Sequence, residues 1–186
     1  MNKPFFFLLL LVCALMAFAP LPFFIQVAHA DVDEAQTSKL LSIFWGIVGY
    51  TRWPDREGPL RICLFEDDLH SAIIRRSARS VELGRPVTTR SVPENAANAC
   101  DIVYVSGTAN DRAGDLARSL ASAPILTIGD GGRFCEMGGM FCLLSGGEGS
   151  SKDVIDRFAV NREAILHSTL RIDPQVLRLS KRNRER

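Results

Sequence analysis

The chain has 186 residues, with 22 Lys and Arg against 21 Asp and Glu, so its formal net charge is +1. This balance excludes the strongly basic surface that nucleic-acid binding requires, and we expect no nucleic-acid partner. The length and the 47% content of hydrophobic residues correspond to one ordinary domain that buries its own core.

The first 30 residues have the three parts of a secretory signal peptide. Lys3 supplies a positive charge, an almost unbroken apolar run extends over Phe5–Ala19, and Ala28-His29-Ala30 places small residues where signal peptidase reads them. We expect cleavage after Ala30, which leaves residues 31–186 as the mature domain outside the cytoplasm. An uncleaved membrane anchor is the alternative, because the apolar stretch reaches Ile25. Two prolines near the end of the stretch favour cleavage.

The first predicted element of the mature chain is an amphipathic helix. After a loose start over residues 31–36, apolar residues recur at helical spacing from Ser38 onward. They are Leu40, Leu41, Phe44, Ile47 and Val48. The helix should stop near Trp53, because Pro54 disfavours a helical conformation at the residue before it.

Strands and helices then alternate. The predicted strands are Leu60–Phe65, Pro86–Val92, Asp101–Ser106 and Ile125–Ile128. One helix follows the first strand, from a cap at Asp67 or Asp68 to about Arg79, with Leu69, Ala72 and Ile73 on its inner face. Another begins at about Asp111 and buries Ala113, Leu116, Ala117 and Leu120. This alternation is typical of parallel α/β units with right-handed crossovers.

After Gly129 the pattern changes to an antiparallel one. Phe134-Cys135 and Met140–Leu144 are expected to be the arms of a hairpin that turns at Gly138-Gly139. A further strand over 154–160, a helix capped by Asn161 and a last helix opened by Asp173-Pro174 complete the chain. We predict a single three-layer α/β domain whose mostly parallel central sheet ends in an antiparallel hairpin portion, with helices on both faces. The basic tail over 178–186 is interpreted as a solvated helix end, with contact to an anionic membrane surface as the alternative.

Four cysteines remain after the leader and its Cys13 are removed: Cys63, Cys100, Cys135 and Cys142. Export favours disulfides over free thiols, and four cysteines allow three pairings that the sequence alone does not distinguish. Proximity favours Cys135 with Cys142, which leaves Cys63 with Cys100. Zinc binding is the alternative, but the spacings contain no C-x-x-C knuckle, so we expect no metal site.

No catalytic constellation stands out in the sequence. His70 and His167 each lie in a predicted helix without a ligand-spaced partner, and Asp68 and His70 are expected on different sides of their helix. Gly129–Gly132 and the Gly/Ser-rich stretch over 145–151 are interpreted as tight turns, because neither opens a helix as a phosphate loop does. We therefore expect no catalytic residues, no cofactor and no enzymatic activity.

Two groups of residues are candidates for binding. Tyr50, Arg52 and Trp53 combine residue types that concentrate in protein–protein hot spots, although packing into the core is the more ordinary role of such aromatic residues. Arg171 lies at i+4 from His167, on the same helical face, and together they could receive a small anionic ligand.

Seven short motifs in order resemble the YfiR family of small bacterial periplasmic proteins. They are Tyr50-Thr51-x-Trp53-Pro54, Ile62-Cys63, Cys100-Asp101-Ile102-Val103-Tyr104-Val105, Leu126-Thr127-Ile128, Gly138-Gly139-Met140, Phe158-x-Val160-Asn161 and Leu170-Arg171-Ile172. The resemblance extends from about Lys39 to Ser180, nearly the whole predicted mature chain.

The resemblance implies a periplasmic regulator and not an enzyme. Proteins of this family bind the periplasmic domain of an inner-membrane diguanylate cyclase and hold it inactive, which lowers cyclic-di-GMP and biofilm formation. An outer-membrane lipoprotein sequesters such a repressor. The resemblance also implies a homodimer and the disulfide pairing that proximity favours, with Cys135–Cys142 clamping the hairpin and making the fold responsive to redox state. The alternative function is a periplasmic small-molecule-binding sensor that feeds another receptor.

Overall fold

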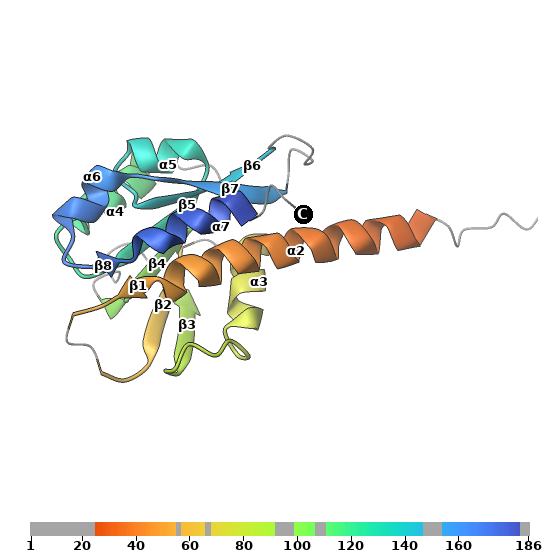
Figure 1. The fold of residues 1–186 in the computed structure, drawn as a ribbon, viewed down its shortest axis with the longest axis horizontal. Helices are drawn as coiled ribbons and strands as arrows, with labels where there is room; N and C mark the ends of the chain where they lie inside the picture. Colours follow the sequence, from red (N-terminus) through yellow and green to blue (C-terminus); the bar gives the residue numbers. More distant parts are fainter. Residues whose placement is uncertain are drawn as a thin grey trace, which may run out of the picture. The chain divides into compact units, whose positions relative to one another are not determined.

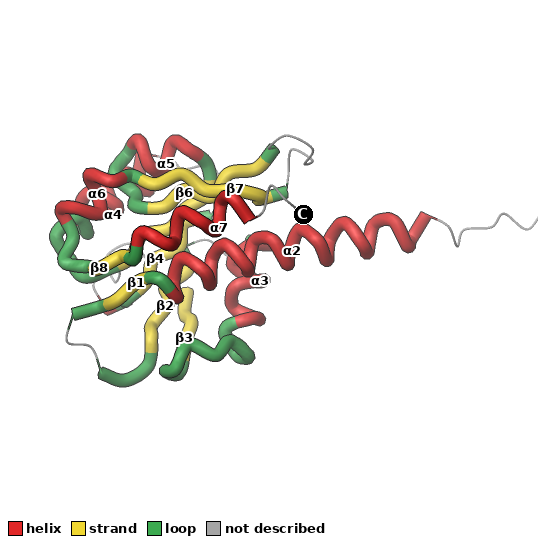
Figure 2. Tube along the Cα trace, viewed as in Figure 1, coloured by secondary structure: helices red, strands yellow, loops and turns green. Residues whose placement is uncertain are grey.

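The computed structural model describes residues 25–54, 57–65, 68–91, 99–106, 111–146 and 154–182 (Figures 1 and 2). The chain divides into two compact units, residues 1–34 and 35–186. The predicted leader falls mostly outside the described residues, so its cleavage stays a prediction. Within the described ranges, no helix combines the length and apolar character needed to cross a membrane.

The first described helix, α2 (Ile25–Gly49), starts earlier than predicted. The expected loose start over residues 31–36 is wrong, because these residues are part of α2. The segment contains no proline that would interrupt a helix. The helix also ends before the expected Trp53. Its buried face consists of Leu40, Ile43, Phe44, Ile47 and Val48. Ile43 takes the place predicted for Leu41, as an i, i+3, i+4, i+7 repeat requires.

A six-stranded sheet forms the centre of the domain. Its strands are β2 (Leu60–Leu64), β3 (Val87–Ser91), β4 (Ile102–Val105), β5 (Leu126–Asp130), β6 (Phe141–Ser145) and β7 (Ile155–Val160). The spatial order is β3-β2-β4-β5-β6-β7, and every neighbouring pair is parallel except β6 with β7. The predicted mostly parallel sheet with an antiparallel portion is confirmed.

Hydrophobic clusters on the two faces of this sheet make three layers. Ile62, Ile102 and Tyr104 point to the face that packs against α2. Cys63 and Val103, which alternate with them, point to the opposite face. That second cluster includes all four residues predicted from the helical spacing: Ala113, Leu116 and Ala117 of α4 (Asp111–Ser119), and Leu120 directly after it. The predicted single α/β domain with helices on both faces is confirmed.

The helix after β2, α3 (Leu69–Ser77), has the predicted cap but not the predicted buried face. The Asp68 carboxylate accepts a hydrogen bond from Ser71 N at 2.9 Å. This cap sets the phase of a short helix, so Ser71 and Ile74 are buried, whereas Leu69 is 63% exposed. The expected inner face is therefore wrong for Leu69 and Ala72, which are exposed, whereas Ile73 is partly buried against the core cluster.

The first arm of the expected hairpin is a helix. Residues Gly132–Glu136 form α5, so Gly131-Gly132 opens a helix directly, contrary to the sequence interpretation. The ring of Phe134 packs against Gly139, where a Cβ would lie 2.1 Å from it. This close packing folds the chain back so that β6 runs parallel to β5, and the antiparallel partner of β6 is β7.

The C-terminal elements begin at the predicted caps. Asn161 Oδ1 accepts from Ala164 N at the start of α6 (Arg162–His167), and Asp173 Oδ1 accepts from Gln175 N. The last segment opens with a 3-10 turn, η2 (Pro174–Val176), and continues as α7 (Leu177–Arg182). The predicted basic tail thus starts within α7, and its last four residues lie outside the described ranges.

A two-stranded ribbon that the sequence did not indicate joins the end of α2 to this C-terminal segment. Strand β1 (Thr51–Arg52) pairs antiparallel with β8 (Arg171–Ile172). Asp173 N donates to the carbonyl of Tyr50 at 2.9 Å, which extends the pairing by one residue. In Figure 1, α7 lies alongside α2, and Leu179 of α7 occupies the space beside Gly46.

Candidate functional site

The direction in which successive strands are added to the sheet reverses between β2 and β4. From β2 the chain crosses through α3 to β3 on one side, and from β4 it crosses through α4 to β5 on the other side. In open α/β sheets, ligands bind beside the carboxyl ends of the strands at such a switch point. Here Ser71, after β2, and Ser106, after β4, place their hydroxyl oxygens 3.5 Å apart.

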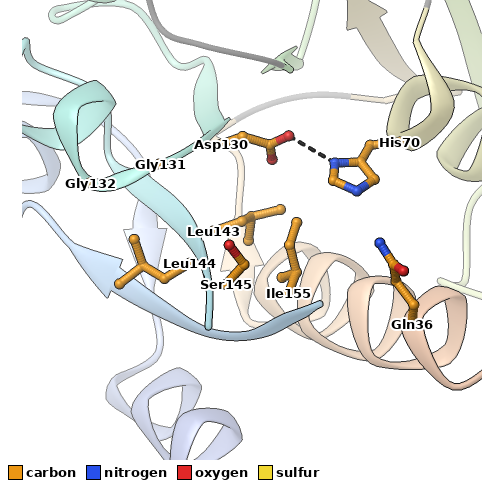
Figure 3. A pocket seen from close by; sticks show the side chains of 9 residues that line it. All are labelled: Gln36, His70, Asp130, Gly131, Gly132, Leu143, Leu144, Ser145 and Ile155. Atoms are coloured by element: carbon orange, nitrogen blue, oxygen red, sulfur yellow. Dashed lines mark hydrogen bonds and ion pairs between the residues drawn. The ribbon is translucent and has the colours of Figure 1, made fainter. Parts of the chain in front are cut away.

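A pocket of about 530 Å³ opens near this edge of the sheet (Figure 3). Its walls come from α2, α3, the end of β5, the start of α5, and the strands β6 and β7. The lining residues are Gln36, His70, Asp130, Gly131, Gly132, Leu143, Leu144, Ser145 and Ile155. The pocket therefore combines an apolar floor with a small number of polar groups, as small-molecule sites do.

The polar centre of the pocket is the carboxylate of Asp130. Its Oδ1 accepts from the Tyr104 hydroxyl and its Oδ2 accepts from His70 Nδ1–H, each at 2.8 Å. In Figure 3 the second ring nitrogen of His70 points away from Asp130, into the space beside Gln36. One carboxylate thus fixes the orientation of both an imidazole and a phenol.

These contacts change the proton affinities of both partners. The hydrogen bond to Asp130 raises the pKa of His70, burial opposes this, and the negative charges of Asp130 and Asp68 raise it further. Burial raises the pKa of Tyr104 well above its usual range, and the charge and hydrogen bond of Asp130 act in the same direction. Tyr104 therefore stays protonated and continues to donate to Asp130.

The sequence interpretation of His70 missed this arrangement. It considered residues near His70 in the chain, whereas Asp130 lies 60 positions away. Donor atoms of Asp68, His70 and Asp130 all lie within 4.8 Å of one another, so the expectation that Asp68 and His70 point to different sides of their helix is wrong. The sequence did contain a signal: Asp130 follows the predicted strand Ile125–Ile128 by two residues, and the carboxyl ends of parallel strands meet at one edge of the sheet.

The candidate surface Tyr50, Arg52 and Trp53 combines packing and exposure. Trp53 is half-buried against the main core cluster, and its Nε1–H donates to the carbonyl of Asp101 at 3.0 Å. Arg52 is exposed. A second pocket, of about 420 Å³, lies beside them; its walls are Val48, Gly49, Thr51, Arg52, Trp53, Leu60, Leu83 and Arg85. Trp53 therefore packs with one part of its ring and borders a pocket with another.

The structure assigns Arg171 to a different place from the one predicted. Helix α6 ends at His167, and Arg171 lies in β8, so the i,i+4 argument that placed the two on one helical face is wrong. His167 is 69% exposed, lies 3.9 Å from Glu163 and lines a separate pocket of about 300 Å³. Arg171 instead lies directly opposite Arg52 in the β1–β8 register, and both are exposed.

The predicted disulfide pairing is confirmed. Cys63–Cys100 connects β2 to the segment before β4, inside the second core cluster. Cys135–Cys142 connects α5 to β6, so it ties a helix to a strand and not the two arms of a hairpin. Cys142 is fully buried, whereas Cys135 is partly exposed.

A comparison of the sequence with protein-family models identifies a family that covers most of this architecture. The family described as YfiR/HmsC-like matches residues 40–181, from the middle of α2 to the last helix. The match includes the sheet, both disulfides, the β1–β8 ribbon and the three pockets described above, except for Gln36.

Proposed function

Because the chain belongs to the YfiR/HmsC-like family, we propose that it is a periplasmic regulator that binds and represses an inner-membrane diguanylate cyclase. The match over residues 40–181 is the observation that carries this proposal. Binding to the periplasmic domain of the cyclase would lower cyclic-di-GMP and biofilm formation. An outer-membrane lipoprotein that sequesters the regulator would reverse the effect.

Repression of this kind requires no chemistry from the regulator. A protein shifts a two-state equilibrium of its partner when it binds one state more tightly than the other. A folded, disulfide-linked domain with an exposed contact surface is sufficient for that role. The proposed regulator is therefore non-catalytic, and its export through the leader over residues 1–30 would bring it to the same compartment as the periplasmic part of the cyclase.

The β1–β8 ribbon is the best-supported contact surface for this partner. Arg52 and Arg171 lie directly opposite each other, although like charges in this position destabilise a strand pair. Arg85 lines the adjacent pocket, and its Nη2 is buried without a hydrogen-bond partner among the described residues. Trp53 provides an apolar wall next to these cations. We expect a partner segment that inserts acidic side chains between the arginines and packs an apolar residue against Trp53.

The partly exposed Cys135–Cys142 disulfide offers a route for redox control. Reduction would release α5 from β6 and loosen one local element while the rest of the sheet stays paired. We also propose the homodimer that the family resemblance implies, and such a dimer would present two copies of the ribbon. Both statements deepen the regulatory proposal.

A binding measurement tests the proposed contact. The periplasmic domain of the membrane cyclase is immobilised, and the full chain, produced with its own leader, is passed over it. We expect the double variant R52E/R171E to lose binding and the control R76E/R79E, which reverses two exposed charges on α3 and the turn after it, to retain it. Equal binding of the cyclase domain by both double variants would show that the ribbon is not part of the interface. No binding by the unsubstituted chain would contradict the proposed function itself.

A small-molecule sensor is the second candidate, because the 530 Å³ pocket in Figure 3 has the size and mixed polarity of a ligand site. In that case the chain would bind a small compound and pass the signal to a receptor other than a cyclase. A ligand that raises the melting temperature of the chain, together with unchanged cyclic-di-GMP in cells that lack the protein, would favour this second candidate.

A further inference from the structure

We propose that Asp68, His70 and Asp130 form a binding site for a divalent transition-metal ion, with Zn²⁺ as the best-matched ion. The three residues come from the cap of α3, its first turn and the end of β5. No metal site is visible in the sequence, because Asp68 and His70 are two positions apart and Asp130 comes from a strand 60 positions after His70. The inference does not depend on the proposed regulatory function.

The geometry of the donors fits a small ion. One donor atom from each residue lies within 4.8 Å of the other two. A tetrahedral zinc ion with bonds of about 2.1 Å holds neighbouring donors about 3.4 Å apart. His70 Nδ1 and Asp130 Oδ2 are already 2.8 Å apart, and all three residues are neither fully buried nor freely exposed. Binding would require small rotations of the Asp68 and His70 side chains that bring the three donor atoms around one centre.

The charge of the site also favours a cation. Two carboxylates flank one imidazole, and the described residues that line the pocket include no Lys or Arg. Asp68 uses one carboxylate oxygen, Oδ1, to cap the helix, which leaves Oδ2 for a metal. A divalent ion between these groups would replace the proton that now joins His70 to Asp130 and would neutralise both carboxylates.

A supporting shell holds one ligand in place. The Tyr104 hydroxyl, fully buried, donates to Asp130 Oδ1 and leaves Oδ2 directed at His70. Outer partners of this kind orient metal ligands and contribute to affinity. Figure 3 shows the pocket opening beside His70, so a fourth coordination position would face the cavity and take water or a small ligand.

The donor set selects among metals. One imidazole nitrogen with two carboxylate oxygens suits Zn²⁺, Co²⁺ or Ni²⁺. Ca²⁺ and Mg²⁺ are hard ions that prefer a shell made of oxygen ligands, so the imidazole nitrogen of His70 disfavours both. The four paired cysteines offer no thiolates, so they do not compete for the ion.

Calorimetric titration with Zn²⁺ alone tests the proposal. The tag-free full chain, expressed with its own leader and treated with a chelator, should bind one Zn²⁺ per chain, and Ca²⁺ should give no saturable signal. We expect H70A and D130N to weaken Zn²⁺ binding by about 100-fold or more, and Y104F by about 10-fold. H167A removes an exposed histidine and serves as the matched control, which should bind as the unsubstituted chain does.

Either of two results would overturn the proposal: unchanged Zn²⁺ affinity in H70A, or no saturable binding by the unsubstituted chain. Circular dichroism establishes that each variant is folded. Histidine-ring NMR resonances of the unsubstituted chain provide a measurement that needs no variant. Saturating Zn²⁺ should shift the resonances of His70 and leave those of His167 in place, and the reverse pattern would also refute the site.

Discussion

Removal of each disulfide should cost a different amount of stability, and the structure says which loss is larger. The variant C63A/C100A opens a loop of 37 residues, and C135A/C142A opens one of 7. On the chain-entropy relation these loops correspond to about 3.8 and about 2.4 kcal/mol of unfolding free energy. The difference of about 1.4 kcal/mol is tenfold in the unfolding equilibrium constant.

Packing increases this difference. Cys63 and Cys100 are both fully buried, whereas Cys135 is partly exposed, so the first double variant also removes more buried sulfur. Equilibrium urea unfolding followed by far-UV circular dichroism under non-reducing conditions measures both variants against the unsubstituted chain. We expect C63A/C100A to show the larger loss and C135A/C142A to remain folded. A larger loss in C135A/C142A would refute the reasoning from loop length and burial.

Three further predictions concern single side chains, each measured by the same urea unfolding. Gly139→Ala should lower the unfolding free energy by about 1–3 kcal/mol, because the added Cβ would collide with Phe134. In the control Gly132→Ala, the added Cβ meets only an ordinary contact at 3.8 Å. Equal losses of unfolding free energy in the two variants would show that Phe134 moves aside freely. Asp101→Asn should cost about 2 kcal/mol, since the buried carboxylate accepts from both the backbone and the guanidinium of Arg61. The exposed control Asp115→Asn should change stability by less than about 0.5 kcal/mol, and a matching loss there would contradict the role of burial. Trp53→Phe should cost about 1 kcal/mol for the lost hydrogen bond to Asp101, and Trp53→Ala about 2–3 kcal/mol; no loss in either would place Trp53 outside the core.

The sequence predicted the elements whose residues carry a clear period. The buried strand over 102–105 and the helix that begins at Asp111 were predicted because each has its own hydrophobic pattern. The caps at Asp68, Asn161 and Asp173 were predicted because a short polar side chain at a helix start satisfies a backbone N–H by itself.

The errors come from segments whose structure depends on distant residues. Phe134-Cys135 is a short apolar run that fits a strand as well as a helix, and the close contact of Phe134 with Gly139 decides between them. The β1–β8 strands have two residues each, too few for any period. Arg171 was therefore assigned to a helix that had already ended at His167.

The candidate site was missed for the same reason. The pairing of His70 with Asp130 spans 60 residues and is created by the order of strands in the sheet. A search for ligands at helical spacing finds only neighbours in the chain. The rule that ligand sites lie at the carboxyl edge of a parallel sheet was the only route from the sequence to Asp130.

The most direct test of the regulatory account is the level of cyclic-di-GMP in the native host after deletion of the gene. We expect deletion to raise this level, and the full chain to restore it. A version without residues 1–30 should fail to restore it, because it would stay in the cytoplasm. An unchanged level in the deletion strain, under conditions in which the protein is normally produced, would contradict repression of a cyclase.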